Sequence, residues 1–96
     1  MSRWGYLNGF CARAAGDRRL QPTHVSLYLA LLREWGSQGF SNPFRIRRQD
    51  LMLVSRVSSR VTYHKRMLEL QHFGYIRYEP TYNYYLGSRV QLLPVG

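Results

Sequence analysis

The chain has 96 residues, which is enough for one domain with a modest core. Its 14 Lys and Arg outnumber its 5 Asp and Glu, so the net charge is +9. All of these cations except Lys65 are arginines, which bind phosphate and guanine in a bidentate manner. The composition therefore favours a nucleic-acid partner, and the 45% hydrophobic content argues against a disordered chain.

The same composition gives expectations about location and chemistry. Cys11 is the single cysteine, so no disulfide can form within the chain, and a reducing, cytoplasmic location is expected. No apolar run approaches the ~20 residues of a membrane span, so we expect no membrane partner. The carboxylates and histidines are scattered, with no catalytic pair or metal-ligand spacing. We therefore predict that the protein is not an enzyme, needs no cofactor or metal, and has no evident small-molecule ligand.

The N-terminal segment places apolar residues at roughly helical steps over residues 3–15, among them Trp4, Leu7 and Phe10. Gly5 and Gly9 lower its helix propensity. This pattern predicts a short helix, with a packed irregular arm as the alternative. We assign residues 1–20 to this helix or arm and residues 21–96 to the main domain.

A second helix is predicted over residues 22–35, because Pro22 suits the first helical position and Gly36 follows the end. Nearly all of it is apolar; away from the ends only Ser26, Ala30 and Arg33 are left for water. Such a helix is the central strut of a domain or also a subunit contact. We expect a homodimer, in which Trp4, Leu7 and Phe10 add contacts.

Residues 44–58 predict a strand, a helix and a turn. Residues 44–47 alternate apolar and basic, which is typical of a short strand with its arginines outward. Residues 48–54 predict a helix that buries Leu51 and Val54. Val57 can fill the corner of the following turn, and Ser58 or Ser59 can cap the next helix. Two helices joined in this way make a helix-turn-helix.

The next helix, over residues 58–73, has two different halves. Its N-terminal half carries hydroxyls and cations, whereas Met67, Leu70 and Phe73 follow at helical spacing. Such a helix can present hydrogen-bond donors to a DNA groove while its other end is anchored in the core. Residues 75–78 and 88–92 are strand-like and predict a hairpin, and we expect residues 94–96 to fray.

The segment from Ser59 to Ile76, with its Leu70–Gln71–His72–Phe73–Gly74–Tyr75–Ile76 ending, resembles the recognition helix and first wing strand of winged helix-turn-helix proteins. Residues 22–92 share this resemblance, which implies an α+β fold with a three-helix core, a short strand and a C-terminal hairpin wing. Residues 20–28, 42–43, 62–65 and 87–90 are similar to small winged-helix regulators carried by mobile elements of Bacteroidetes. This narrower resemblance implies double-stranded DNA as the partner and transcription regulation as the role.

On this interpretation the helix 58–73 reads the major groove and the 75–92 wing lies on the backbone. The expected DNA-binding residues are Arg45, Arg47, Arg48, Ser58, Ser59, Arg60, Thr62, Lys65, Arg66, Tyr82, Asn83 and Arg89. The wing tyrosines are equally consistent with a packed hairpin edge. An alternative function is a protein-interaction or accessory module of a replication, excision or transfer complex.

Overall fold

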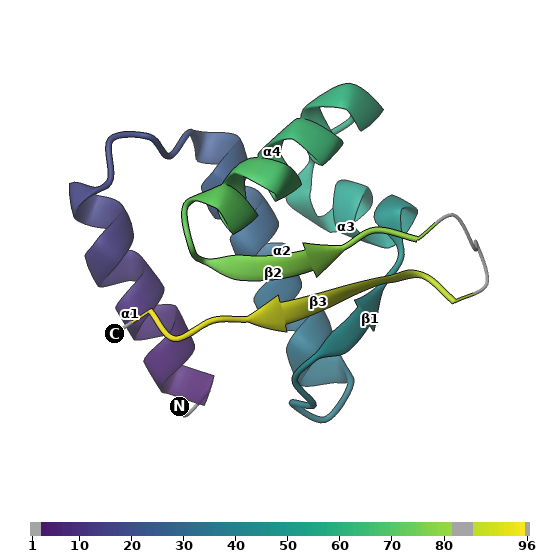
Figure 1. The fold of residues 1–96 in the computed structure, drawn as a ribbon, viewed down its shortest axis with the longest axis horizontal. Helices are drawn as coiled ribbons and strands as arrows, with labels where there is room; N and C mark the ends of the chain where they lie inside the picture. The colour runs from purple at the N-terminus through teal and green to yellow at the C-terminus, as the bar shows by residue number, and fades with distance from the viewer. Residues whose placement is uncertain (1–2, 82–85, 96) are drawn as a thin grey trace.

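A computed structural model describes residues 3–81 and 86–95, and Tyr82 and Asn83 lie outside this part of the chain. Within the described residues, four helices and a three-stranded antiparallel sheet form an α+β fold with winged-helix-like topology, as the sequence predicts (Figure 1). The elements are α1 (Arg3–Gly16), α2 (Pro22–Ser37), β1 (Phe44–Ile46), α3 (Arg48–Ser55), α4 (Arg60–His72), β2 (Ile76–Glu79) and β3 (Ser88–Leu92).

The sheet has the strand order β1-β3-β2, so the last strand lies between the other two. Val90 of β3 pairs with Phe44 on one side and with Tyr78 on the other, and all three side chains are buried. Arg89 pairs with Arg45 and with Glu79, and these three side chains are exposed. Because side chains alternate along a strand, one face of the sheet covers the core and the other carries the arginines.

Helix α2 lies behind the sheet in Figure 1 and forms the centre of the core, to which every helix and strand contributes. The helical alternative for the N-terminal segment is confirmed, since α1 is continuous from Arg3 to Gly16. Its Phe10 stacks on Tyr28 of α2 with ring centroids 3.9 Å apart, and meets Tyr75 edge-on. Phe10 is thus 1% exposed in its own chain, so the expectation that it adds a dimer contact is wrong. Trp4 remains 69% exposed.

The predicted helical phase is wrong at Val54, which is 43% exposed. Leu51 is buried as predicted, but the residue one turn later, Ser55, is buried with it. The Ser26 hydroxyl of α2 donates to the carbonyl of Ser55, so the side of α3 that carries Leu51 and Ser55 is the side that meets α2. Val54 falls outside this contact.

The predicted solvent face of α2 is also shifted. Ala30 is 3% exposed, whereas Leu29 is 44% exposed. Ala30 follows Ser26 by one turn and therefore lies on the same side of the helix, which is the side that contacts α3 through Ser26. A small side chain at this position allows the two helices to approach closely.

The C-terminal segment does not fray as expected at Val95, whose side chain is 4% exposed. It runs beside α1, where both chain ends lie in Figure 1. A Cβ atom built on Gly9 would lie 2.5 Å from the carbonyl oxygen of Val95, so the absence of a side chain at Gly9 permits this contact. Helix α1 and the C-terminal segment hold each other in place.

Candidate nucleic-acid interface

The turn between α3 and α4 is built by four consecutive residues with separate tasks. Arg56 adopts a left-handed conformation (φ 62°) that ends α3. Val57 is 4% exposed and fills the corner between the helices, as predicted. Ser59 caps α4 through its hydroxyl, which accepts a hydrogen bond of 3.2 Å from the backbone N–H of Thr62. Ser58 is exposed and leaves its hydroxyl at the surface beside the cap.

Helix α4 is held on two opposite sides. Toward α2, the Arg66 guanidinium donates to the Thr23 hydroxyl at 2.9 Å, and Glu69 lies 3.1 Å from His24. Toward the hairpin, the Gln71 side chain accepts a hydrogen bond of 2.7 Å from the backbone N–H of Tyr78. The side of α4 that faces neither neighbour is the exposed stripe of Val61, Lys65 and His72. Leu68, which is 50% exposed, lies at the edge of this stripe beside the hairpin.

A groove of about 630 Å³ lies between α4, the start of α3 and the hairpin. Its basic side chains come from the start of α3 and from α4: Arg47, Arg48, Arg60 and His64. Tyr63 and Tyr78 also line it and are almost wholly buried. Both phenols are neutral at neutral pH, and burial raises their pKa further.

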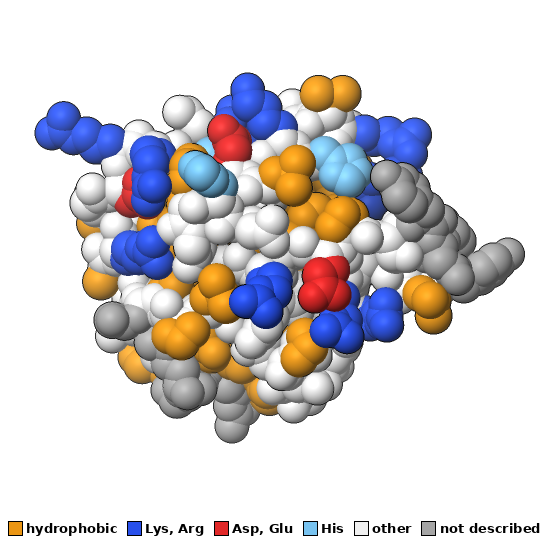
Figure 2. Space-filling view, viewed as in Figure 1, with side chains coloured by type: hydrophobic (Ala, Val, Ile, Leu, Met, Phe, Trp, Pro, Cys, Tyr) orange, Lys and Arg blue, Asp and Glu red, His pale blue; other side chains and the backbone are white. Residues whose placement is uncertain are grey.

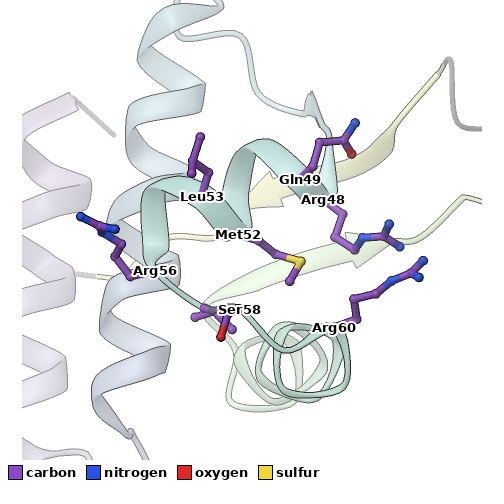
Figure 3. Close-up of a pocket in the computed structure, with 8 residues that line it drawn as sticks. Arg48, Gln49, Met52, Leu53, Arg56, Ser58 and Arg60 are labelled. Carbon is purple, nitrogen blue, oxygen red and sulfur yellow. The ribbon is translucent and has the colours of Figure 1, made fainter.

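A second hollow of about 490 Å³ lies between α3 and the start of α4 (Figure 3). Met52, Leu53 and Val57 give it an apolar lining. Arg48 and Arg60 line both hollows, and Figure 3 shows their side chains extending in the same direction from the starts of α3 and α4. These two arginines therefore mark the ridge between the hollows.

The acidic side chains in the described part of the chain lie away from both hollows, which no Asp or Glu lines. Glu69, the acid of α4, is turned toward α2, where hydrogen bonds from Arg66 and His24 lower its pKa. Glu79 lies on the outer face of the sheet, 3.4 Å from Arg89. Figure 2 shows basic groups spread over this face of the molecule, with acidic groups beside some of them.

The structure brings together only part of the predicted DNA-binding set. Arg47, Arg48 and Arg60 converge on the groove, and Lys65 lies exposed on the outer stripe of α4. Ser58 and Ser59 lie in the turn before α4, and Thr62 is half-buried in its first turn.

The other predicted residues lie elsewhere. Arg66 is turned toward α2, with 22% of its side chain exposed and its guanidinium bonded to Thr23 and Glu69. Arg45 and Arg89 lie on the outer face of the sheet, where the Arg45 guanidinium donates to the carbonyl of Gly87. Tyr82 and Asn83 lie outside the described residues.

Sequence reasoning missed His64 and Val61. His64 follows Arg60 by four residues, and this spacing places both on one side of a helix, so the sequence contained the signal. Val61 is 79% exposed, but an apolar residue in a helix is usually expected in the core. Only the packing of α4 shows that Val61 belongs to the outer stripe.

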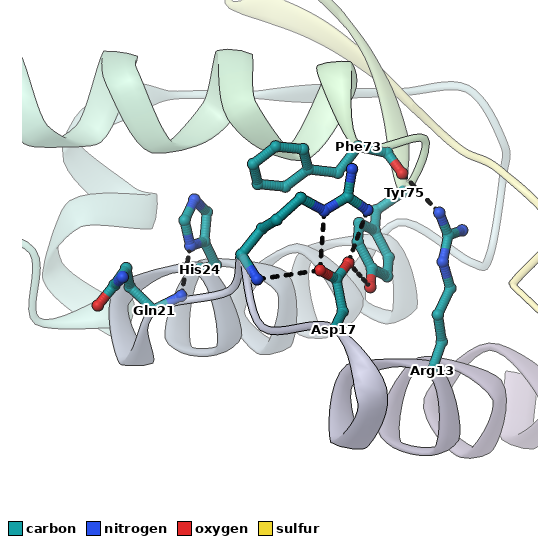
Figure 4. A network of polar contacts seen from close by, with 7 residues as sticks. Arg13, Asp17, Gln21, His24, Phe73 and Tyr75 are labelled. Atoms are coloured by element: carbon teal, nitrogen blue, oxygen red, sulfur yellow. Dashed lines mark hydrogen bonds and ion pairs between the residues drawn. The ribbon is translucent and has the colours of Figure 1, made fainter.

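The far end of α4 is fixed by a polar network from α1 and the loop after it (Figure 4). Asp17 accepts hydrogen bonds from Arg19 at 2.8 Å and from the Tyr75 hydroxyl at 2.8 Å, and these bonds hold its pKa well below the usual range. The Arg13 guanidinium donates to the carbonyl of Phe73, where α4 ends. The network sets where α4 ends and the hairpin begins.

Comparison of the chain with protein-family models, with curated proteins and with solved structures gives no match. Within residues 3–81 and 86–95, no three or more His, Cys, Asp or Glu side chains cluster as a metal site would require. None of the described helices combines the length and apolar character of a bilayer span.

Proposed function

We propose that this chain is a double-stranded DNA-binding protein that regulates transcription, and that it acts on genes of a mobile element. Helix α4 enters the major groove, and the β2–β3 hairpin lies along the adjacent backbone. The observation that carries this proposal is the groove in which Arg47, Arg48, Arg60 and His64 converge without an acidic residue. A surface of this charge attracts phosphates, and a helix beside it can reach base edges.

The orientation of α4 supports the same proposal. Its acidic residue and Arg66 are both engaged with α2, so the exposed sides of the helix carry cations and no negative charge. The N-terminal end of α4 is also the end that carries Arg60, close to the positive end of the helix dipole. In helix-turn-helix proteins the N-terminal residues of this helix contact the bases.

The proposal is tested by titrating duplex DNA at several salt concentrations. Binding that releases counterions gives a log–log slope of about −0.9 for each phosphate neutralised. The variant Arg48→Ala/Arg60→Ala should weaken binding and bring this slope about two units closer to zero. The matched control is Arg18→Ala/Arg33→Ala, which removes the same charge from exposed positions outside the groove and the hairpin and should retain most of the slope. Absence of duplex binding at low salt, or equal effects of the two variants, would contradict the proposal.

One observation favours a second function. The hollow lined by Met52, Leu53 and Val57 is apolar, and Leu53 is 75% exposed. An exposed apolar surface of this kind suits a protein-interaction module of a replication, excision or transfer complex. This function becomes the better one if the duplex titration shows a slope near zero. In that case Leu53→Ala should impair assembly with the partner.

A further inference from the structure

Val61 is chemically unlike its neighbours on the exposed surface of α4. It is 79% exposed, the largest exposed fraction among the large apolar side chains described. Arg60, His64 and Lys65 surround it along the helix, and each of them carries a polar group. An apolar side chain kept in water at this position contributes nothing to the core, which the opposite side of α4 supplies through Tyr63, Met67 and Leu70.

The position of Val61 is fixed by its surroundings. It lies in the first turn of α4, whose start is capped by Ser59 through the N–H of Thr62. Since α4 contacts α2 through Arg66 and Glu69 and contacts the hairpin through Gln71, Val61 points away from both. Its β-branched side chain has one strongly preferred rotamer in a helix, so its methyl groups have a defined place on the surface.

We infer that Val61 contacts the 5-methyl group of a thymine and makes the protein prefer a T·A pair at that position. This inference rests on the proposed function and deepens it. Val61 cannot bond to a phosphate or to the nitrogen and oxygen atoms of the base edges. The thymine methyl is the apolar group that a base pair presents in the major groove, and apolar side chains recognise it there. The arginines of the groove then position the helix, and Val61 selects a base.

The experiment replaces single thymines by deoxyuracil, which removes only the methyl group and leaves the hydrogen-bonding edge unchanged. A preferred duplex is first selected from a random pool with the unaltered protein, and each thymine of the selected site is then replaced in turn. Loss of one buried methyl should weaken binding by the unaltered protein about fourfold at one position. Val61→Ala should bind the thymine and deoxyuracil duplexes equally at that position.

Leu29→Ala is the matched control, because Leu29 is also an exposed apolar side chain, at 44%, but lies on α2 and lines neither hollow. This variant should keep the fourfold preference for thymine. The inference is overturned if Val61→Ala retains the same sensitivity as the unaltered protein at every thymine, or if no deoxyuracil duplex binds the unaltered protein more weakly. These results leave duplex binding itself intact, whereas failure of the unaltered protein to bind any duplex at low salt overturns the proposed function as well.

Discussion

His24 shows how one residue connects the start of α2 to α4. It is 0% exposed, and its Nδ1 accepts a hydrogen bond of 2.7 Å from the backbone N–H of Gln21. The proton of the neutral ring is therefore on Nε2, which donates to Glu69. His24 is thus a capping and packing residue at the start of α2. This arrangement requires the neutral ring, since Nδ1 cannot accept once it is protonated.

His24 should make the stability of the fold depend on pH. Burial lowers its pKa below the ordinary 6.5, so below about pH 6.5 the unfolded chain binds a proton that the folded chain does not. The free energy of unfolding should be constant above this pH. It should fall as the pH drops below about 6.5, by at most about 1.4 kcal/mol per pH unit.

Urea denaturation across this pH range measures the effect. His24→Gln should abolish the slope, whereas His72→Gln, which changes an exposed ring, should keep it. A slope that survives in the His24 variant would show that another group is responsible.

At the scale of elements, α4 depends on a sharp division between its buried and exposed sides. Leu70 is 0% exposed and Leu68 is 50% exposed, although both are leucines in the last two turns. Leu70→Ala should lower the free energy of unfolding by about 2–5 kcal/mol, because it leaves a cavity in the core. Leu68→Ala should change it by less than about 0.5 kcal/mol. Similar losses in thermal or denaturant melts of both variants would mean that the helix is rotated from this orientation.

The order and type of the elements could be predicted from the sequence, because Pro22 and Gly74 mark helix ends and the apolar spacing along the helices is regular. Gly36 did not end α2, which continues to Ser37. The buried side of each helix was harder to predict, as Val54 and Ala30 show. A helix with apolar residues on several sides does not reveal which side meets which neighbour. Contact between Ser26 and Ser55 decides the phase, and this contact depends on tertiary packing.

The candidate site was predictable to a similar extent. Arg47 and Arg48 stand where α3 begins and Arg60 stands where α4 begins, so local reasoning about the two helices found them. Arg45 was predicted to point outward from its strand and Arg89 to lie on the wing, and the structure pairs them on the outer face of the sheet. Their place follows from the pairing of β1 with β3, strands that are more than 40 residues apart in the chain. Spacing along the sequence contains no information about such a pairing.

At the scale of the whole molecule, α1 changes the role of α2. The wide apolar surface of α2 suggested a subunit contact, but α1 covers part of it through the stack of Phe10 on Tyr28. The N-terminal segment therefore belongs to the same hydrophobic core as the rest of the described chain. Arg13 of α1 also donates a hydrogen bond to the backbone carbonyl at the end of α4. Helix α1 therefore stabilises the position of the helix that is proposed to read DNA.

The junction between the two chain ends provides a test of this architecture. A Cβ atom at Gly9 would lie 2.5 Å from the carbonyl oxygen of Val95, whereas a Cβ atom at Gly16 would meet nothing within 4 Å. Gly9→Ala should therefore lower the free energy of unfolding by about 1–3 kcal/mol, because α1 and the C-terminal segment must separate. The higher helix propensity of alanine alone would stabilise α1 by up to about 1 kcal/mol. The expected change in the free energy of unfolding therefore has the opposite sign to the change that propensity predicts. Gly16→Ala, at the end of the same helix, should be neutral or slightly stabilising. Denaturant melts measure the stability of both variants. Equal stabilisation by the two substitutions would mean that α1 does not pack against Val95.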